Sequence, residues 1–282
     1  MDRLWIDKYR PKTLDTLDYH FDLSIKLQKL SKMSDFPHLL LYGPNGAGKK
    51  TRVMAFLNEV YGNGVNKLKS ELREFKVSAT SSTTVECNII SSNYHIDITP
   101  SDAEYHDKSI VQNLIKEVAS TNQLDSKAQR AFKVIIINEV DKLSKEAQAA
   151  LRRTMEKYIS KCRLILICEN MGKVIAPIRS RCLMIRVGAP SEIEIQGILE
   201  KITKKENIFN QEGLCSKISK DSERNLRRGI MQLQTCKMQR VTTIDQKLHI
   251  PEWRLAIKSV ADDVRQEQTP KKYIFFLLRK FK

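Results

Sequence analysis

Five short runs of aliphatic and β-branched residues recur along the first 187 residues, and they predict strands. They cover residues 38–42, 94–98, 133–138, 163–168 and 183–187. Three of these runs are almost continuously apolar, which is typical of strands that helices cover on both faces, as in a parallel sheet. Because helical patterns alternate with the runs, the sequence predicts an α/β domain in this part of the chain.

The chain departs from this alternation in two regions. Residues 71–98 are rich in Thr and Val with polar interruptions, which indicates extra strands or a hairpin inserted ahead of the second core strand. From Ala189 onward only helical patterns occur, and three amphipathic ones predict a small bundle. The three patterns cover residues 190–207, 212–221 and 224–239. A further helical unit begins near Ile250.

Composition narrows the class of protein. A hydrophobic content of 41% in 282 residues is enough to bury a core, which excludes a disordered chain. The formal net charge of +16 favours a polyanionic partner such as nucleic acid, although a basic surface can also serve solubility alone. Six scattered cysteines without a C-x-x-C pair fit neither a zinc site nor a disulfide framework. The amino-terminal residues lack the apolar core of a signal peptide, so we expect an intracellular protein without a membrane partner.

A glycine-rich segment, GPNGAGKKT at 43–51, lies between a predicted strand and a predicted helix. Such a turn points successive backbone N–H groups at phosphate oxygens, and the helix amino terminus adds partial positive charge. The segment therefore predicts a phosphate-binding loop in which Lys49 reaches the terminal phosphates. The candidate nucleotide-binding residues of the loop are Gly43, Pro44, Asn45, Gly46, Ala47, Gly48, Lys49, Lys50 and Thr51.

Two residues depart from the pattern of a hydrolytic site. The Ser or Thr that normally ligates magnesium after the lysine is replaced by Lys50, and Thr51 is turned a further 100° or so around the helix. After the apolar run 134–137, the expected metal-holding Asp is Asn138, whereas the water-activating Glu is retained as Glu139. A cation about 5 Å from a divalent ion costs up to about 6 kcal/mol at an effective dielectric of about 20. We therefore expect a site that binds ATP or ADP, holds Mg²⁺ weakly or not at all, and hydrolyses poorly.

Several segments together resemble a known family. They are WIDKYRPKTLDTL at 5–17, GPNGAGKK, NEVDKLSKEAQAALRRTMEKY at 138–158, PIRSRC at 177–182 and NLRRGIMQLQ at 225–234. In order and spacing they resemble the boxes of the small subunits of the sliding-clamp loader replication factor C, of the AAA+ class. The resemblance covers most of residues 1–250, and the SRC and ALRRTME strings are its most specific parts.

The resemblance implies a fold and its domains. We expect an α/β AAA+ domain over 1–187, with a parallel sheet flanked by helices, a helical lid over 188–245, and the start of a helical collar over 246–282. The terminal YIFFLLRKFK is too short to span a bilayer and does not look like collar sequence, so we expect an incomplete collar and weakened assembly.

The resemblance also implies roles for individual residues. Arg181 corresponds to the arginine finger offered to a neighbouring subunit's ATP, and a cation at the γ-phosphate is what phosphoryl transfer requires. Arg227 corresponds to the nucleotide-sensing arginine of the lid, although its neighbour Arg228 is an alternative. Tyr9 and Arg10 correspond to the segment around the adenine. Glu139 is retained as a weak catalytic residue of the chain's own site.

A sensor position and a DNA-facing helix complete the candidate residues. Glu169 stands where the family usually has a sensor Asn, and an ionised carboxylate cannot donate a hydrogen bond to phosphate. Lys108 and Ser109 open a helical pattern whose start faces the DNA backbone by resemblance, where backbone N–H groups make contacts independent of sequence. The apolar stripe that follows, with Gln112 beside it, is typical of core, but a minority of it can touch the clamp.

The function implied is that of a subunit that uses ATP to help load a PCNA-type clamp onto primer-template DNA in replication and repair, in the nucleus, with the other replication factor C subunits. Two alternatives stay open. A self-sufficient AAA+ ATPase acting on nucleic acid requires the residues at 50 and 138 to be harmless. A pure scaffold requires that nucleotide binding has been lost.

Overall fold

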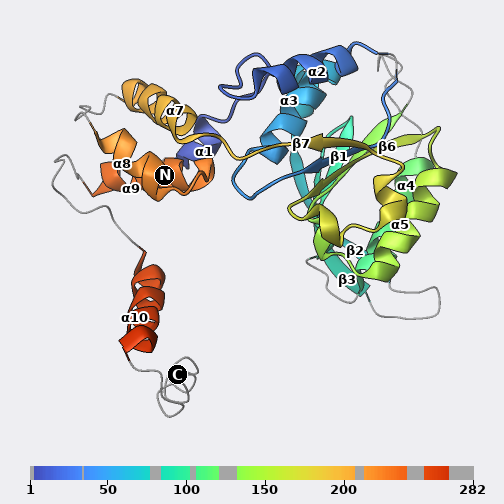
Figure 1. Ribbon diagram of the computed structural model, residues 1–282. Coiled ribbons are helices and arrows are strands. Elements are labelled where there is room, and N and C mark those ends of the chain that lie inside the picture. Colours follow the sequence, from blue (N-terminus) through green and yellow to red (C-terminus); the bar gives the residue numbers. More distant parts are fainter. Residues whose placement is uncertain are drawn as a thin grey trace.

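The computed structural model describes residues 3–33, 35–76, 84–101, 106–120, 132–206, 213–239 and 251–266. Its centre is a seven-stranded sheet with the order β2-β3-β4-β5-β6-β1-β7 (Figure 1). The strands are β1 (Leu39–Tyr42), β2 (Lys69–Lys76), β3 (Thr84–Ser91), β4 (His95–Ile98), β5 (Lys133–Ile137), β6 (Cys162–Cys168) and β7 (Leu183–Arg186). All five predicted strands are therefore confirmed to within a residue at each end.

The sheet is mixed, with a parallel majority. β4, β5, β6, β1 and β7 run parallel, as predicted, whereas β3 pairs antiparallel with both β2 and β4. The antiparallel pair β2 and β3 is the inserted hairpin that Thr and Val richness predicted, although it begins at Lys69, slightly before the predicted segment. The insertion therefore extends one edge of the sheet.

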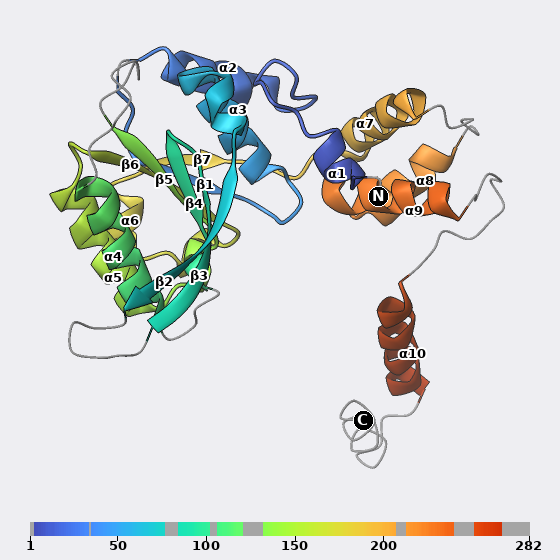
Figure 2. The same cartoon turned by 180° about the vertical axis from the view of Figure 1, so that it is seen from behind.

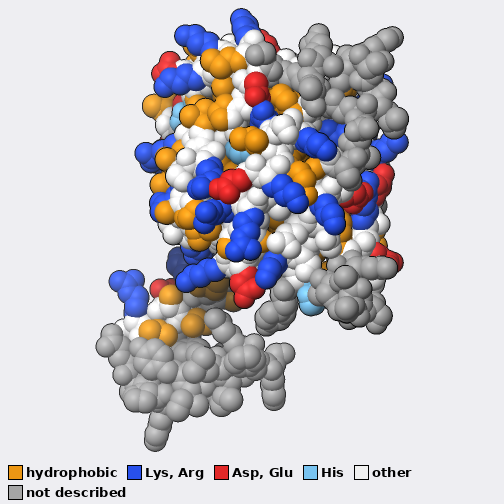
Figure 3. Space-filling model, turned by 90° about the vertical axis from the view of Figure 1, so that its right-hand side faces the viewer, with side chains coloured by type: hydrophobic (Ala, Val, Ile, Leu, Met, Phe, Trp, Pro, Cys, Tyr) orange, Lys and Arg blue, Asp and Glu red, His pale blue; other side chains and the backbone are white. Residues whose placement is uncertain are grey.

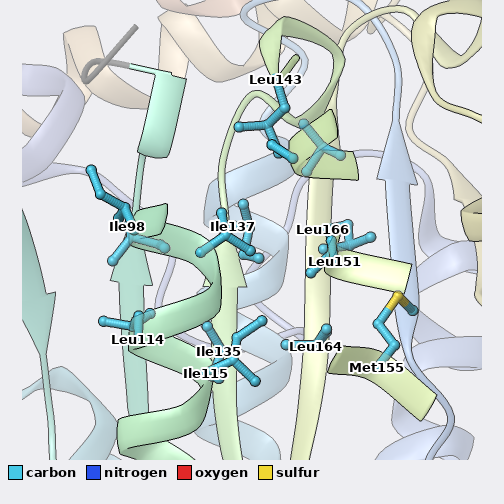
Figure 4. Packing of buried hydrophobic residues seen from close by; sticks show 14 of the residues in the cluster. Ile98, Leu114, Ile115, Ile135, Ile137, Leu143, Leu151, Met155, Leu164 and Leu166 are labelled. Carbon is cyan, nitrogen blue, oxygen red and sulfur yellow. The ribbon is translucent and has the colours of Figure 1, made fainter. Parts of the chain in front are cut away.

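Helices cover both faces of the sheet, which explains its apolar strands. The helices of the chain are α1 (Trp5–Lys8), α2 (Phe21–Ser31), α3 (Lys49–Tyr61), α4 (Asp107–Ser120), α5 (Lys145–Lys157), α6 (Ala176–Arg179), α7 (Glu192–Lys205), α8 (Leu214–Asp221), α9 (Leu226–Met238) and α10 (Glu252–Gln266). One core cluster joins α4, α5 and α6 to the sheet, and a second joins α2 and α3 to its other face. Figure 4 shows Leu151 and Met155 of α5 and Leu114 of α4 packed over Ile137 and Leu164 of the strands.

The apolar stripe of α4 belongs wholly to this core. Its members are at most 5% exposed: Ile110, Val111, Leu114, Ile115 and Val118. These buried side chains offer little surface to a clamp, and contact through the partly exposed Gln112 beside them stays a prediction. The core interpretation of the stripe is confirmed.

The helices α7, α8 and α9 form a separate small bundle beside the sheet (Figure 2). Trp5 of α1 and Tyr19 pack into its core, so this bundle is built from residues that precede the sheet in sequence and residues that follow it. Gln234 of α9 accepts a hydrogen bond from the Trp5 backbone N–H at 3.1 Å, which fixes α1 against the bundle. The helix α10 lies apart from this core, and Arg254 pairs with Glu223 at 2.6 Å.

No helix among the described residues is long and apolar enough to cross a membrane. The terminal segment YIFFLLRKFK lies outside the described residues. The expected boundary at 187/188 stays a prediction, and the one at 245/246 lies outside the described residues. We retain both as proposed domain limits.

Two buried histidines predict a pH dependence of stability. Burial lowers the pKa of His38 and of His95 to about 4 from an ordinary 6.5. Between pH 6.5 and pH 4 the unfolded chain therefore binds protons that the folded chain does not, so the free energy of unfolding falls as the pH falls. We expect a loss of about 1 kcal/mol per histidine at pH 5.5, measured by urea denaturation. A His95→Asn variant is expected to show a shallower slope, and an unchanged slope would contradict the assignment.

Candidate nucleotide site and arginine finger

The glycine-rich loop follows β1 and leads directly into α3, as the sequence predicted. Two of its glycines sit where no side chain fits. A Cβ on Gly43 would lie 1.9 Å from the Val187 carbonyl oxygen, and one on Gly46 would lie 1.8 Å from the Asn225 side-chain oxygen. Both residues also have positive φ, at 152° and 75°. The loop is therefore a tight cradle between β7 and the amino-terminal end of α9.

Lys49 is held inside this cradle. Its side-chain Nζ donates to the carbonyl oxygens of Gly43 at 2.6 Å and Pro44 at 3.0 Å. Burial lowers the pKa of Lys49, and the nearby carboxylates of Glu169 and Asp141 oppose that shift. The ammonium is thus placed in the turn of the loop, where a phosphate oxygen can replace the two carbonyl acceptors.

Lys50 and Asn138 meet through a residue that sequence reasoning missed. Asp97 lies at the carboxyl end of β4, is 3% exposed, and accepts Lys50 Nζ at 2.6 Å on one oxygen. Its other oxygen accepts Asn138 Nδ2 at 2.6 Å, and the same amide nitrogen reaches the Ile98 carbonyl at 3.1 Å. The charge at Lys50 is therefore balanced by a buried carboxylate.

These residues do not fit a magnesium ion. A hard cation needs oxygen ligands, but both oxygens of Asp97 already accept N–H donors, and Lys50 stands where a hydroxyl would be required. Thr51, one residue further, turns its hydroxyl to Arg10, whose Nη1 donates to it at 3.3 Å. Within the described part of the chain, no group of three or more His, Cys, Asp or Glu is arranged to hold a metal ion.

A cavity of about 610 Å³ opens beside the loop, between the sheet unit and the lid. Sequence-predicted residues from three segments line it: Tyr9, Arg10, Gly46, Gly48, Thr51 and Arg227. Apolar Ile198, Ile202 and Ile230 of the lid complete its wall. A mainly apolar pocket joined to a phosphate cradle suits a nucleotide, so the geometry fits the base at one end and the phosphates at the other.

The lid arginine at the loop is Arg227. Its Nη1 lies 3.4 Å from the Asn45 side-chain oxygen, whereas Arg228 turns away and pairs with Asp221 at 2.8 Å. Of the two neighbours, Arg227 is therefore the one that faces the loop, and its role as the nucleotide sensor stays a prediction. Pro44 and Ala47 contribute backbone carbonyls, to Lys49 and to the Tyr19 hydroxyl.

Tyr9 also contacts a carboxylate that the sequence did not single out. Glu206, at the end of α7, accepts hydrogen bonds from the Tyr9 hydroxyl and from the ammonium groups of Lys8 and Lys237. These three donors lower the pKa of Glu206 to about 2. The Tyr9 ring is thereby fixed to the lid side of the cavity.

Glu139 is held by two neighbours through one carboxylate oxygen, Oε2. Its carboxylate pairs with Lys142 at 2.8 Å and accepts from the Ser101 hydroxyl at 3.3 Å. Its backbone has φ of 53°, in the left-handed region that is unfavourable for a residue with a side chain. Such strain is often found at functional sites, which agrees with the placement of Glu139 at the end of β5.

Arg181 lies near the amino-terminal ends of the parallel strands, whereas the cradle lies at their carboxyl ends. Arg181 lies two residues before β7, which runs parallel to β1 with Leu183 beside Leu39, whereas the loop follows the last residue of β1. The four residues of each strand separate these two ends of the sheet by about 13 Å. Its side chain therefore cannot serve the cradle of its own chain, and it is paired with Glu156 of α5 at 2.6 Å.

The predicted DNA-facing residues lie at the start of α4. Asp107 caps this start and also accepts from the Ser144 backbone N–H at 2.7 Å, so the first turns of α4 and α5 are joined. Lys108 is half exposed and pairs with Glu146 at 3.1 Å, and Ser109 follows it on the first turn. Lys and Arg side chains are also spread over the side of the molecule that Figure 3 shows.

Two residues missed by sequence reasoning, Asp97 and Glu156, share a reason. Each pairs with a partner distant in sequence, so spacing alone does not reveal it. The local signal for Asp97 is an acidic residue between two isoleucines in a short strand, where a buried charge needs a partner. Glu156 lies in the ALRRTME string, but nothing local marks its partner.

Comparison with known proteins agrees with the fold of the two units. Residues 21–191 match the family model described as DNA polymerase III, delta subunit, and residues 197–238 match RCF1/5-like, AAA+ ATPase lid domain. The fold is similar to the Thermotoga maritima RuvB Holliday junction branch migration motor, with a TM-score of 0.59 and 15% identity over 85% of this chain and 69% of that one. At that identity the likeness concerns the fold alone.

Sequence relatives are much closer. The chain is 48% identical to replication factor C subunit 3 of Arabidopsis thaliana over 95% of this chain and 77% of the relative. It is 45% identical to the human protein of the same name over 96% and 76%, and 46% identical to rice replication factor C subunit 5 over 99% and 79%. The resemblance inferred from the sequence boxes is thereby confirmed, and the chain belongs to the replication factor C subunit family, among relatives named subunit 3 and subunit 5.

Proposed function

We propose that this chain is a clamp-loader subunit that binds ATP or ADP without magnesium, hydrolyses it weakly or not at all, and supplies Arg181 to the nucleotide of a neighbouring subunit. The observation that carries the proposal is the closed network of Lys50, Asp97 and Asn138 beside an otherwise intact phosphate loop. Its relatives are named as replication factor C subunits, which supports assembly with other such subunits.

The network explains how nucleotide can bind without a metal. The Lys50 ammonium occupies the helix position that normally supplies a metal-ligating hydroxyl and is paired with Asp97, so Lys49 in the turn of the loop is the cation available to the phosphates. A lysine supplies positive charge but cannot polarise an attacking water as a divalent ion does. Binding is retained on this account, whereas the rate of hydrolysis is low.

The partners follow from the same assignment. We propose that the subunit works with the other replication factor C subunits and a PCNA-type clamp on primer-template DNA, in replication and repair within the nucleus. The net charge of +16 and the exposed Lys108 at a helix start support contact with a phosphate backbone. Contacts of this kind carry no sequence information, which suits recognition of a junction by its shape.

Nucleotide titration of the purified chain tests the metal-free site. We expect a fluorescent ADP analogue to bind with the same affinity, within about twofold, in millimolar magnesium and in EDTA, because the described residues around the loop offer the metal no ligand set. A Lys49→Ala variant serves as the binding control and is expected to lose most of the affinity. Affinity that collapses in EDTA would contradict the proposal.

Single-turnover hydrolysis of ATP by the purified chain distinguishes the proposed clamp-loader subunit from the two alternatives. A self-sufficient AAA+ ATPase would hydrolyse ATP as an isolated chain and lose that activity on Glu139→Gln. A pure scaffold would bind no nucleotide in either condition. We expect binding without appreciable hydrolysis, and no further change on Glu139→Gln.

A further inference from the structure

We propose that Glu156 is a positioning residue that holds Arg181 ready for the neighbouring subunit's nucleotide. The inference rests on the proposed function of Arg181 and adds to it a residue of α5 that never touches the nucleotide itself. It concerns the conformation of one guanidinium before the neighbour arrives.

The contacts of Arg181 define its conformation almost completely. Nε donates to Glu156 Oε1 at 2.7 Å, and Nη2 lies 2.6 Å from the same oxygen. Nη1 donates to the Pro177 carbonyl at 2.8 Å. Because the guanidinium is planar, contacts on both of its sides set the direction in which it points.

Glu156 stands on a rigid support. The Ser144 side chain caps the start of α5, and Ala147, Leu151 and Met155 bury its inner face in the core. Glu156 follows Met155 directly, so its Cα is fixed by a residue that is 1% exposed. A carboxylate on such a helix can define the place of a partner from a short, separate segment.

The same carboxylate also separates Arg181 from a second cation. Arg152, one turn earlier on α5, lies 3.7 Å from Glu156 Oε1 through its Nε. Two guanidiniums that share one carboxylate attract it and repel each other. Without the negative charge, Arg181 would be both released and driven away from Arg152.

The two side chains remain accessible to a neighbour. The Arg181 side chain is 35% exposed and that of Glu156 is 47% exposed. A γ-phosphate approaching from a neighbouring subunit can therefore meet the outer N–H groups while the inner ones stay on Glu156. Preorganisation of this kind lowers the barrier by removing the search for the reactive conformation.

The test uses the complete reconstituted complex and measures hydrolysis at the neighbouring site. We expect Glu156→Gln to lower the turnover number there by about 10- to 100-fold with the KM for ATP changed less than about twofold, because ground-state binding does not need the finger. Glu156→Asp, which keeps the charge on a shorter side chain, is expected to recover part of the rate. Complex formation is checked by gel filtration and should be unchanged.

A matched control is available on α4. Glu117 pairs with Arg73 at 2.9 Å, with side-chain exposures of 53% and 32% that resemble those of the Glu156 pair. Glu117→Gln therefore removes an equivalent surface ion pair, and we expect it to leave turnover unaltered.

The double variant decides between positioning and a general structural role. If Glu156 acts through Arg181, then Glu156→Gln combined with Arg181→Ala loses no more than Arg181→Ala alone. Additive losses, a raised KM, or loss of the complex would overturn the inference. An inactive Arg181→Ala complex beside a fully active Glu156→Gln complex would refute the positioning role alone, whereas a fully active Arg181→Ala complex would refute the proposed function of Arg181 itself.

Discussion

Replacing Arg181 with alanine is expected to slow hydrolysis at the neighbouring subunit's site by about 10³-fold or more, because an arginine finger contributes on that order to phosphoryl transfer. The measurement is single-turnover hydrolysis in a reconstituted complex in which only the neighbouring site is competent. The chain's own cradle lies at the opposite end of the strands from Arg181, so nucleotide binding by this subunit should be unchanged.

Loss of folding is not an alternative explanation for that result. Among the described residues, the hydrogen bonds of the Arg181 side chain beyond Glu156 go to the Pro177 carbonyl and the neighbouring Ser180 hydroxyl. Arg186→Ala, at an exposed arginine of the following strand β7, is the control and is expected to keep wild-type turnover. An Arg181→Ala complex that hydrolyses at the wild-type rate would rule out a finger at this position.

Replacing Lys50 with threonine is expected to destabilise the chain and to make nucleotide binding depend on magnesium. The change leaves the buried Asp97 carboxylate with the Asn138 amide as its remaining side-chain donor of this network. Breaking a buried ion pair costs about 3–5 kcal/mol, and partial solvation of Lys50 reduces the expected loss to about 2–3 kcal/mol. Urea denaturation measures the loss.

The new hydroxyl and the released Asp97 oxygen are the kind of ligands that magnesium prefers. The nucleotide affinity of Lys50→Thr should therefore rise at least about tenfold when magnesium is added, whereas the affinity of the wild-type chain should not change. Lys50→Arg retains a cation opposite Asp97 and is the matched control, expected to stay independent of the metal. Equal affinities of Lys50→Thr with and without magnesium would show that the network does not decide metal use.

The elements of this fold were predictable because their signals are local. An apolar run such as 133–138 can bury both of its faces only inside a sheet that helices cover on both sides. The phosphate loop is recognisable from its glycines, which allow backbone conformations that other residues avoid. The hairpin over β2 and β3 was predicted from composition for the same reason. The α4 stripe was ambiguous, because helical periodicity shows that a face is apolar but not what covers it.

The site was only half predictable. The replacement of the metal ligands by Lys50 and Asn138 is visible in the sequence, but their pairing with Asp97 is not, because it depends on register. β4 and β5 pair in parallel with Asp97 beside Ile136, which brings a residue 41 positions earlier to the Asn138 side chain. A shift of one residue would have turned Asp97 to the other face of the sheet.

The sequence by itself determined the family, the alternation of strands and helices, the phosphate loop and the loss of its metal-binding residues, since each of these is written in neighbouring residues. Only the tertiary structure decided that Lys50 is neutralised by Asp97, that Arg227 rather than Arg228 faces the loop, and that Glu156 holds Arg181. The reason is that charge pairing acts over a few ångströms, and only folding brings residues that are far apart in the sequence within that distance.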